Sequence, residues 1–139
     1  MSNQVLGGGG FHHVALRVVD FDRTVRFYSD VLGFRERVRW TSGETRAMML
    51  DTGDGNYLEV FSGAKRQPGE DAPESAIIHF ALRTTDLDGA IERARAAGMQ
   101  VTMEPKSLDL PSEPPVPIRI AFFKGPDGEV VELFQNEVL

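Results

Sequence analysis

The sequence predicts an α+β protein that is built from two tandem βαβββ modules. The pattern Asp-Gly-x-x-[Leu/Val]-Glu-[Val/Leu]-Phe occurs at 54–61 and again at 127–134, an offset of 73 positions. A second repeat relates 13–22 to 79–88 at an offset of 66 positions, and six of its ten positions are identical. Because self-similarity at a fixed spacing is typical of a duplicated supersecondary unit, we expect two copies of one fold.

The first copy is expected to begin with a strand at 13–19, where apolar residues alternate with other residues. Asp20 or Asp22 can cap the helix that follows, and Gly33 ends it. The apolar residues of this helix recur with the helical period, at Phe21, Val25, Tyr28 and Leu32. Three further strands are expected, at 34–41, 46–51 and 56–61.

The second copy repeats this order. A strand from Ile78 leads to a helix that Gly98 ends, with its apolar positions at Leu87, Ile91, Ala94 and Ala97. Strands are expected at 100–104, 118–123 and 129–134. The segment 105–117 contains five prolines, and proline cannot donate a hydrogen bond to a β-ladder. We therefore expect this segment to be a loop over one end of the sheet.

The predicted organisation of the chain follows from these copies. It consists of a flexible N-terminus at 1–10, a first module at 11–62, a linker at 63–76 and a second module at 77–139. Four consecutive glycines favour mobility in the N-terminal segment, and glycine, proline and charged residues dominate the linker.

Bulk properties narrow the function classes. The net charge of −6 argues against binding to nucleic acid or to anionic membranes. No apolar run approaches the length of a membrane span, and no signal peptide is recognisable. Without cysteine the chain has neither a disulfide framework nor a thiol nucleophile. Together these features predict a cytoplasmic protein of ordinary globular composition.

Each repeat carries one histidine and one glutamate at matching places. For a single copy, the simplest interpretation is a solvated glutamate on an edge strand and an ordinary hydrogen-bonded histidine. The repetition favours a different interpretation, in which these residues form one site. If the first and last strands of each copy pair, and pseudo-twofold symmetry relates the copies, four side chains converge: His13, Glu59, His79 and Glu132. Two imidazoles and two carboxylates suit a divalent ion with open positions, and such an ion would compensate carboxylates on an apolar face.

Several motifs resemble those of a known family. Each half opens with His-x-[Ala/Gly]-[Leu/Ile], the first helix ends in Phe27, Tyr28, Val31, Leu32 and Gly33, and 125–133 reads Gly-Pro-Asp-Gly-x-x-Val-Glu-Leu. From Phe11 to Gln135 the chain resembles the vicinal oxygen chelate superfamily. That superfamily includes glyoxalase I, methylmalonyl-CoA epimerase, extradiol dioxygenases, and bleomycin and fosfomycin resistance proteins. The resemblance implies the glyoxalase-like fold, in which curved half-barrel sheets of paired βαβββ modules enclose a metal cleft.

The resemblance also implies a site. His13, Glu59, His79 and Glu132 fall on the metal-ligand positions of glyoxalase I, which implies one divalent ion: nickel, cobalt or zinc. It further implies proton abstraction next to a carbonyl, with Glu132 as base, Glu59 as its symmetric counterpart and a metal-stabilised enediolate. Extradiol dioxygenases need additional catalytic histidine and tyrosine. The third histidine, His12, should face away from His13 on a strand, which argues against a dioxygenase.

The sequence supports the metal chemistry better than it supports glutathione as the substrate. Arg17 matches an arginine that contacts the glutathione carboxylate in glyoxalase I, although it could equally be a solvated charge at a strand end. Arg83 and Trp40 are further candidates for substrate binding or for structural roles. Gly63 replaces the expected asparagine, and 109–117 contains no basic residue in place of the expected lysine.

The functional hypothesis is a metal-dependent isomerase or lyase of the glyoxalase type that acts on a small carbonyl compound. A thiol adduct is one candidate substrate, which would make the enzyme a lactoylglutathione lyase. The alternatives are a methylmalonyl-CoA-type epimerase and a non-catalytic, resistance-type binding protein. Because curved modules leave an apolar concave face and open edges, a homodimer is expected, with modules that are either swapped between chains or not.

Overall fold

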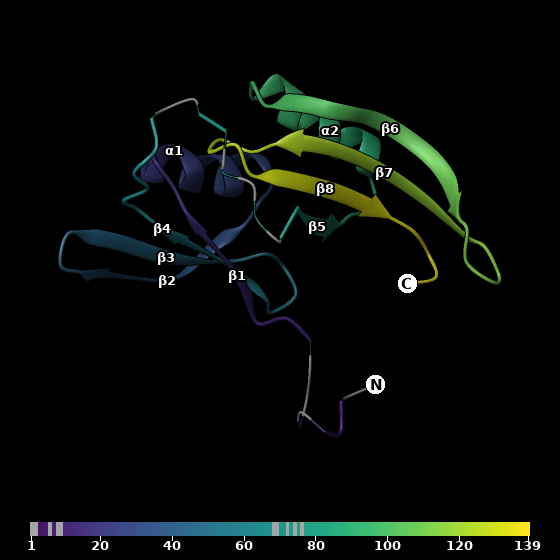
Figure 1. The fold of residues 1–139 in the computed structure, drawn as a ribbon, viewed down its shortest axis with the longest axis horizontal. Coiled ribbons are helices and arrows are strands. Elements are labelled where there is room, and N and C mark those ends of the chain that lie inside the picture. Colours follow the sequence, from purple (N-terminus) through teal and green to yellow (C-terminus); the bar gives the residue numbers. More distant parts are fainter. Residues whose placement is uncertain are drawn as a thin grey trace. The chain divides into compact units, whose positions relative to one another are not determined.

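Each half of the chain folds into a four-stranded mixed sheet with a helical segment across one face (Figure 1). In this computed structural model the chain divides into two units, Met1–Lys65 and Arg66–Leu139. The predicted α+β fold with two βαβββ modules is therefore confirmed. The residues that the structure describes are 3–5, 7, 10–67, 70–71, 73, 75 and 77–139.

The first unit has the strand order β1-β4-β3-β2. Its elements are β1 (His13–Arg17), α1 (Phe21–Arg26), η1 (Phe27–Val31), β2 (Arg35–Ser42), β3 (Thr45–Asp51) and β4 (Tyr57–Phe61). Strands β1 and β4 pair in parallel, whereas the pairs β3–β4 and β2–β3 are antiparallel. The first and last strands of the copy are thus neighbours.

The second unit repeats this topology with the strand order β5-β8-β7-β6. Its elements are β5 (Phe80–Arg83), α2 (Leu87–Ala96), β6 (Gln100–Leu110), β7 (Val116–Lys124) and β8 (Val130–Gln135). Here too the first and last strands, β5 and β8, pair in parallel, and the other pairs are antiparallel.

An aspartate caps the start of each α-helix. Asp20 accepts a hydrogen bond from the backbone N–H of Arg23, and Asp86 accepts one from that of Gly89, each at 3.0 Å. These side chains satisfy N–H groups that have no partner within the helix. The first helix continues beyond α1 as the π-helical turn η1, and Gly33 then adopts a φ of 76°, a value that glycine tolerates without strain.

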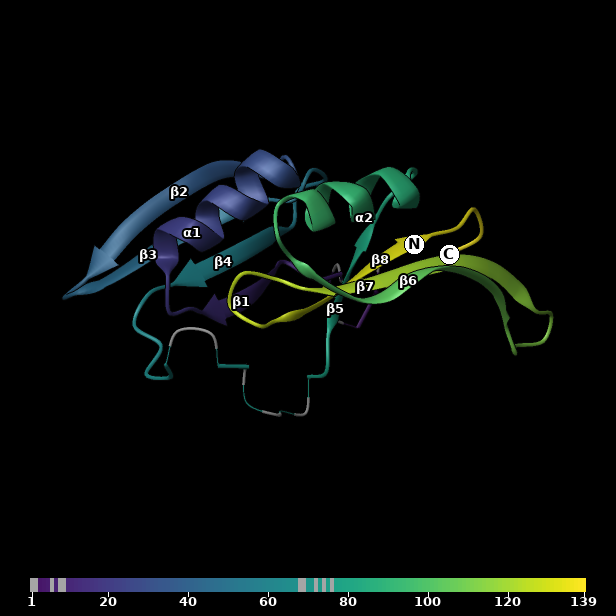
Figure 2. The ribbon, with the colours of Figure 1, turned by 90° about the horizontal axis from the view of Figure 1, so that it is seen from above.

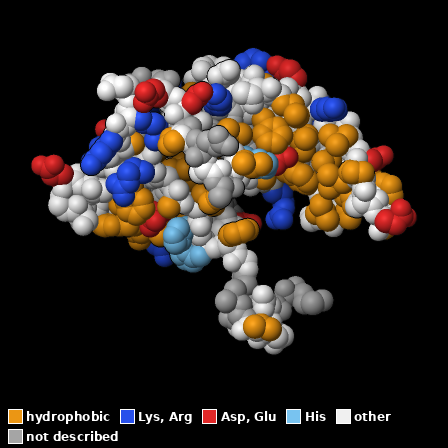
Figure 3. Space-filling model, in the orientation of Figure 1, with side chains coloured by type: hydrophobic (Ala, Val, Ile, Leu, Met, Phe, Trp, Pro, Cys, Tyr) orange, Lys and Arg blue, Asp and Glu red, His pale blue; other side chains and the backbone are white. Residues whose placement is uncertain are grey.

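The core of each unit lies between its sheet and its helical segment (Figure 2). Tyr28, Leu50 and Val60 are fully buried in the first unit, and Leu87, Ile91 and Phe123 are fully buried in the second. Hydrophobic side chains also gather on the face of β6, β7 and β8 that Figure 3 shows.

Among the described residues, no helix combines the length and the apolar character that a membrane span requires.

The predicted proline-rich loop is wrong at both of its ends. Strand β6 runs through Pro105 to Leu110, and β7 begins at Val116 before Pro117. Pro105 is tolerated because β6 is the edge strand and its register with β7 shifts between Met103 and Lys106. The loop is therefore confined to the residues between Leu110 and Val116.

The predicted N-terminal segment and linker lie partly outside the described residues. Where the linker is described, it contacts both units. The backbone N–H of Ala64 donates to the carbonyl of Val18 in the first unit. In the second unit, the side chain of Arg66 pairs with that of Asp127, and Asp71 accepts from Lys124 at 2.9 Å.

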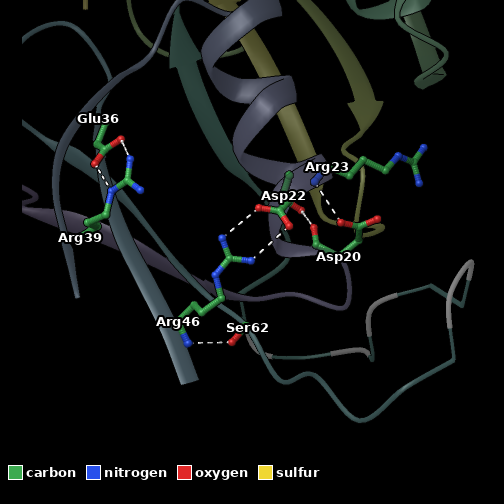
Figure 4. Close-up of polar contacts among 8 residues, drawn as sticks. Asp20, Asp22, Arg23, Glu36, Arg39, Arg46 and Ser62 are labelled. Atoms are coloured by element: carbon green, nitrogen blue, oxygen red, sulfur yellow. Dashed lines mark hydrogen bonds and ion pairs between the residues drawn. The ribbon is translucent and has the colours of Figure 1, made fainter. Parts of the chain in front are cut away.

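An arginine–aspartate pair joins helix and sheet in each unit. Arg46 on β3 donates to both carboxylate oxygens of Asp22 on α1, at 3.1 and 2.9 Å, as Figure 4 shows. Arg119 on β7 repeats this bidentate contact with Asp88 on α2, at 2.9 and 2.6 Å. The hydrogen bond from each arginine holds the pKa of its partner carboxyl below the usual value.

These pairs predict a pH dependence of folding. A carboxyl whose pKa is lowered in the folded state stabilises the fold above its unfolded pKa and loses that effect as the pH falls through the folded pKa. We expect the double variant Asp22→Asn, Asp88→Asn to be less stable than the wild type at pH 7 in urea unfolding. The difference should vanish in acid, where the wild-type carboxyls are protonated too.

Glu44→Gln serves as the control, because Glu44 is exposed and forms no ion pair that the structure records among its described residues. A loss of stability in the double variant that persists unchanged in acid would contradict the assigned role of the two pairs.

Candidate functional site

The first candidate pair joins His13 and Glu59. His13 begins β1, and Glu59 lies in the middle of β4, opposite Ala15. Residues two apart on a strand share a face, so the parallel register sets the histidine diagonally beside the glutamate. His13 Nε2 lies 3.6 Å from Glu59 Oε1. The glutamate is only 9% exposed, whereas the histidine side chain is 40% exposed.

The second candidate pair, His79 and Glu132, has the same arrangement. Glu132 lies on β8 opposite Ala81, and His79 directly precedes β5. The two side chains are closer here, with His79 Nε2 3.0 Å from Glu132 Oε2. Glu132 is 8% exposed, and the ring of Phe122 packs edge-on against His79 at a centroid distance of 5.2 Å. Each buried carboxylate thus faces one imidazole.

Burial dominates the electrostatics of Glu132. Loss of hydration raises the pKa of its carboxyl above the usual value, although the charge of His79 and its hydrogen bond act in the opposite direction. A carboxylate with a raised pKa is a stronger base than a solvated one. The local environment therefore suits Glu132 to accepting a proton.

His12 does not face away from His13, contrary to the sequence-based expectation. It precedes β1 and is therefore not subject to the alternation of side chains along that strand. Its Nδ1 lies 2.9 Å from Nδ1 of His13, and the two rings meet edge-on. Histidine side chains are visible at the surface beside β1 in Figure 3.

Two of the three substrate-binding candidates lie in the first unit. The guanidinium of Arg17 lies 5.4 Å from the centre of the Phe61 ring, and its Nη1 donates to the carbonyl of Ser62 at 3.0 Å. Trp40 is 39% exposed and packs edge-on against Phe61 at 6.1 Å. Phe61, which motif reasoning treated as a strand residue only, thus links the two candidates.

Arg83 occupies the equivalent place in the second unit. It ends β5 opposite Phe134, as Arg17 ends β1 opposite Phe61. It is exposed and forms no ion pair recorded within the described part of the chain. Both arginines thus lie two positions beyond the residue that pairs with the buried glutamate.

The donor atoms can be compared with those of a metal site. Each unit offers one imidazole nitrogen and one carboxylate oxygen, a combination that suits borderline divalent ions. In the ranges that the structure describes, no group of three or more potential ligands is assembled. Each unit by itself therefore provides half of the predicted set.

Residues 10–133 match the family model of the glyoxalase/bleomycin resistance protein/dioxygenase superfamily. A lactoylglutathione lyase of Haemophilus influenzae is 32% identical over 131 residues, which cover 90% of this chain and 91% of that protein. A lactoylglutathione lyase of Arabidopsis thaliana is 30% identical over 139 residues. The match covers 91% of this chain but only 44% of the plant protein, so the chain spans less than half of its length.

The fold is shared with solved structures. A domain from Frankia, described as a glyoxylase/bleomycin resistance protein/dioxygenase domain, superimposes with a TM-score of 0.74. The superposition covers 93% of this chain and 98% of the Frankia chain at 24% sequence identity. At that identity the likeness shows the fold alone.

The raised pKa of Glu132 predicts a stabilising substitution in the metal-free protein. Because the folded state favours the protonated carboxyl, its ionisation costs stability as the pH rises above the unfolded pKa. We expect Glu132→Gln, after removal of metal with a chelator, to be more stable than the wild type at pH 7. Urea unfolding should show this advantage shrinking as the pH falls.

Glu137→Gln is the control, since Glu137 is exposed near the chain end. If Glu132→Gln were instead less stable at neutral pH, the His79 contact would outweigh the cost of burial.

Proposed function

The chain belongs to the glyoxalase/bleomycin resistance protein/dioxygenase superfamily, and on that premise we propose that it is a metal-dependent isomerase or lyase acting on a small carbonyl compound. The observation that carries the proposal is the duplicated pair of a histidine and a buried glutamate, one in each module. A buried carboxylate requires a positive partner, and a divalent ion meets that requirement for both pairs at once.

In this proposal His13, Glu59, His79 and Glu132 hold one divalent ion: nickel, cobalt or zinc. The donor set fits such an ion, because in each pair a ring nitrogen and a carboxylate oxygen lie close enough together, at 3.6 and 3.0 Å, to bind the same ion. When bound, the ion supplies Lewis-acid chemistry, which stabilises negative charge that develops on a carbonyl oxygen.

The protein's own residues carry the proton transfer. Glu132 removes a proton from the carbon next to the carbonyl, since burial raises the pKa of its carboxyl and so favours the protonated product. The protonated Glu132 then returns this proton to the adjacent carbon, and Glu59, its counterpart in the repeat, would serve the opposite face of the substrate in the same way. Positive charge from Arg17 and Arg83 would attract an anionic group of the substrate, and Trp40 would form an apolar wall.

The relatives named as lactoylglutathione lyases favour a glutathione or other thiol adduct as substrate. An epimerase of the methylmalonyl-CoA type is the second candidate, because two equivalent glutamates would also allow proton removal on one face of a carbon and return on the other. A resistance-type binding protein would use the same fold without proton transfer.

Metal analysis and proton exchange test the proposed function. We expect one divalent ion per site. In D₂O, deuterium should enter the carbon next to the carbonyl of the methylglyoxal–glutathione hemithioacetal, as measured by NMR. Glu132→Gln should keep most of the metal while lowering turnover at least about 100-fold, the usual scale for loss of a general base.

Glu137→Gln provides the matched surface control for this substitution. Unchanged turnover in Glu132→Gln would exclude the glutamate as base. Metal binding without exchange in any carbonyl substrate would favour the binding protein.

The working unit is proposed to be a homodimer. Val38 and Trp40 of the first unit and Met103 of the second are large apolar side chains that remain exposed. A second chain could cover these side chains and close the open sheet edges. We favour the swapped arrangement, in which His13 and Glu59 of one chain share an ion with His79 and Glu132 of the other.

A mixing experiment distinguishes the two arrangements. A His13→Ala, Glu59→Ala chain and a His79→Ala, Glu132→Ala chain would be unfolded and refolded together. Swapped heterodimers should recover metal binding at one of their two sites, measured by equilibrium dialysis, because one site then combines both intact modules. Recovery of no site would support unswapped modules, and a monomer with a filled site would exclude the dimer.

A further inference from the structure

We propose that His12 is a positioning residue that accepts a hydrogen bond from His13 and thereby prepares His13 for metal binding. This inference rests on the proposed metal site and adds to it a residue outside the four ligands. The contact that carries it is the 2.9 Å separation between Nδ1 of His12 and Nδ1 of His13. A distance this short between two ring nitrogens is that of a hydrogen bond.

His12 is itself held in place. Its carbonyl oxygen accepts the backbone N–H of Tyr57 at 2.9 Å, which extends the parallel pairing of β1 and β4 by one residue. Its ring also packs against the Tyr57 ring at a centroid distance of 5.3 Å. The ring is therefore supported from its backbone and from one side, although the residue is exposed.

The donor and acceptor of this hydrogen bond follow from the proposed metal coordination of His13. A neutral imidazole has one N–H donor and one acceptor nitrogen. Nε2 of His13 faces Glu59, so when an ion is bound there it is the nitrogen that would offer its lone pair to the ion. The proton of His13 then resides on Nδ1, which donates to Nδ1 of His12. His12 in turn carries its own proton on Nε2.

This hydrogen bond would serve as the support that a ligand histidine commonly receives from a neighbouring acceptor. Such a contact fixes both the ring orientation and the nitrogen that carries the proton, and its loss typically weakens metal binding by roughly 10–100-fold. A histidine as acceptor replaces the carboxylate or backbone carbonyl that more often has this role.

The second module provides an internal comparison. The residue before His79 is Ile78, which is 73% exposed and cannot accept a hydrogen bond through its side chain. His79 instead packs against the Phe122 ring and lies closer to its own glutamate. A hydrogen bond from the preceding residue is thus available to His13 but not to His79. Substitution of Ile78 therefore offers a matched control.

The test uses cobalt(II) as the probe and the whole chain described above. His12→Phe keeps an aromatic ring against Tyr57 but removes the acceptor, whereas His12→Asn keeps an acceptor oxygen near the position of Nδ1. Competition with a chromophoric chelator should show roughly 10–100-fold weaker cobalt binding for His12→Phe. His12→Asn should recover most of the loss, and Ile78→Phe should bind cobalt as the wild type does.

A second measurement locates the proton of His13 directly. Long-range ¹H–¹⁵N correlations of the imidazole rings in the zinc-loaded wild type should show the proton of His13 on Nδ1, shifted downfield by the hydrogen bond to His12, and His12→Phe should lose that shift. A wild-type His13 with its proton on Nε2 would overturn the inference, as would cobalt affinity that is unchanged in His12→Phe. A wild type that binds neither cobalt nor zinc would instead contradict the proposed function, and this inference with it.

Discussion

The burial of one carboxylate in each module is the constraint on which the rest of the candidate site depends. Glu59 and Glu132 lie on strands whose neighbouring residues are mostly apolar, and an ionised carboxylate loses on the order of 5 kcal/mol of hydration in such a place. Parallel pairing of the first and last strands compensates for this cost, because it sets a histidine diagonally beside each glutamate. The helix and the two antiparallel strands then support that pairing.

The two modules share a scaffold but differ around their histidines. The scaffold is duplicated down to individual contacts, since the pair of Arg46 and Asp22 recurs as Arg119 and Asp88. Around the ligand candidates the copies diverge: a histidine contacts His13 and a phenylalanine contacts His79. The distances to the glutamates differ as well, at 3.6 and 3.0 Å. A duplicated fold can therefore place chemically equal candidate ligands in unequal environments.

The segment between the modules contributes residues to both units. Ala64 donates to Val18 of the first unit, and Arg66 pairs with Asp127 of the second. Asp127 belongs to the Asp-Gly turn that defines one of the repeats, whereas in the first copy the equivalent Asp54 accepts from Asn56 beside it. The same turn residue thus serves a local contact in one copy and a distant one in the other.

The sequence by itself determined the modular fold, the approximate course of most strands and helices, and the four residues that we propose as ligands. The alternating pattern of strands and the 3.6-residue period of helices are local features of the sequence. The duplication indicated which distant segments pair, a question that a single copy leaves open. The extent of the strands around the prolines was not predictable in this way, because Pro105 is tolerated only on an edge strand at a register shift. Asp20 rather than Asp22 is the helix cap because α1 begins at Phe21, which places Asp22 in the first turn, where it binds Arg46 from 24 positions away.

Only the tertiary structure decided the surroundings of the site. The alternation of side chains along a strand predicted that His12 faces away from His13, which is wrong. His12 precedes the strand, and a backbone hydrogen bond with Tyr57 sets its position. Phe61 and Phe122 likewise became neighbours of Arg17 and His79 through strand pairing. Such contacts join residues that are far apart in the sequence or just outside a regular element, where local periodicity carries no information about direction.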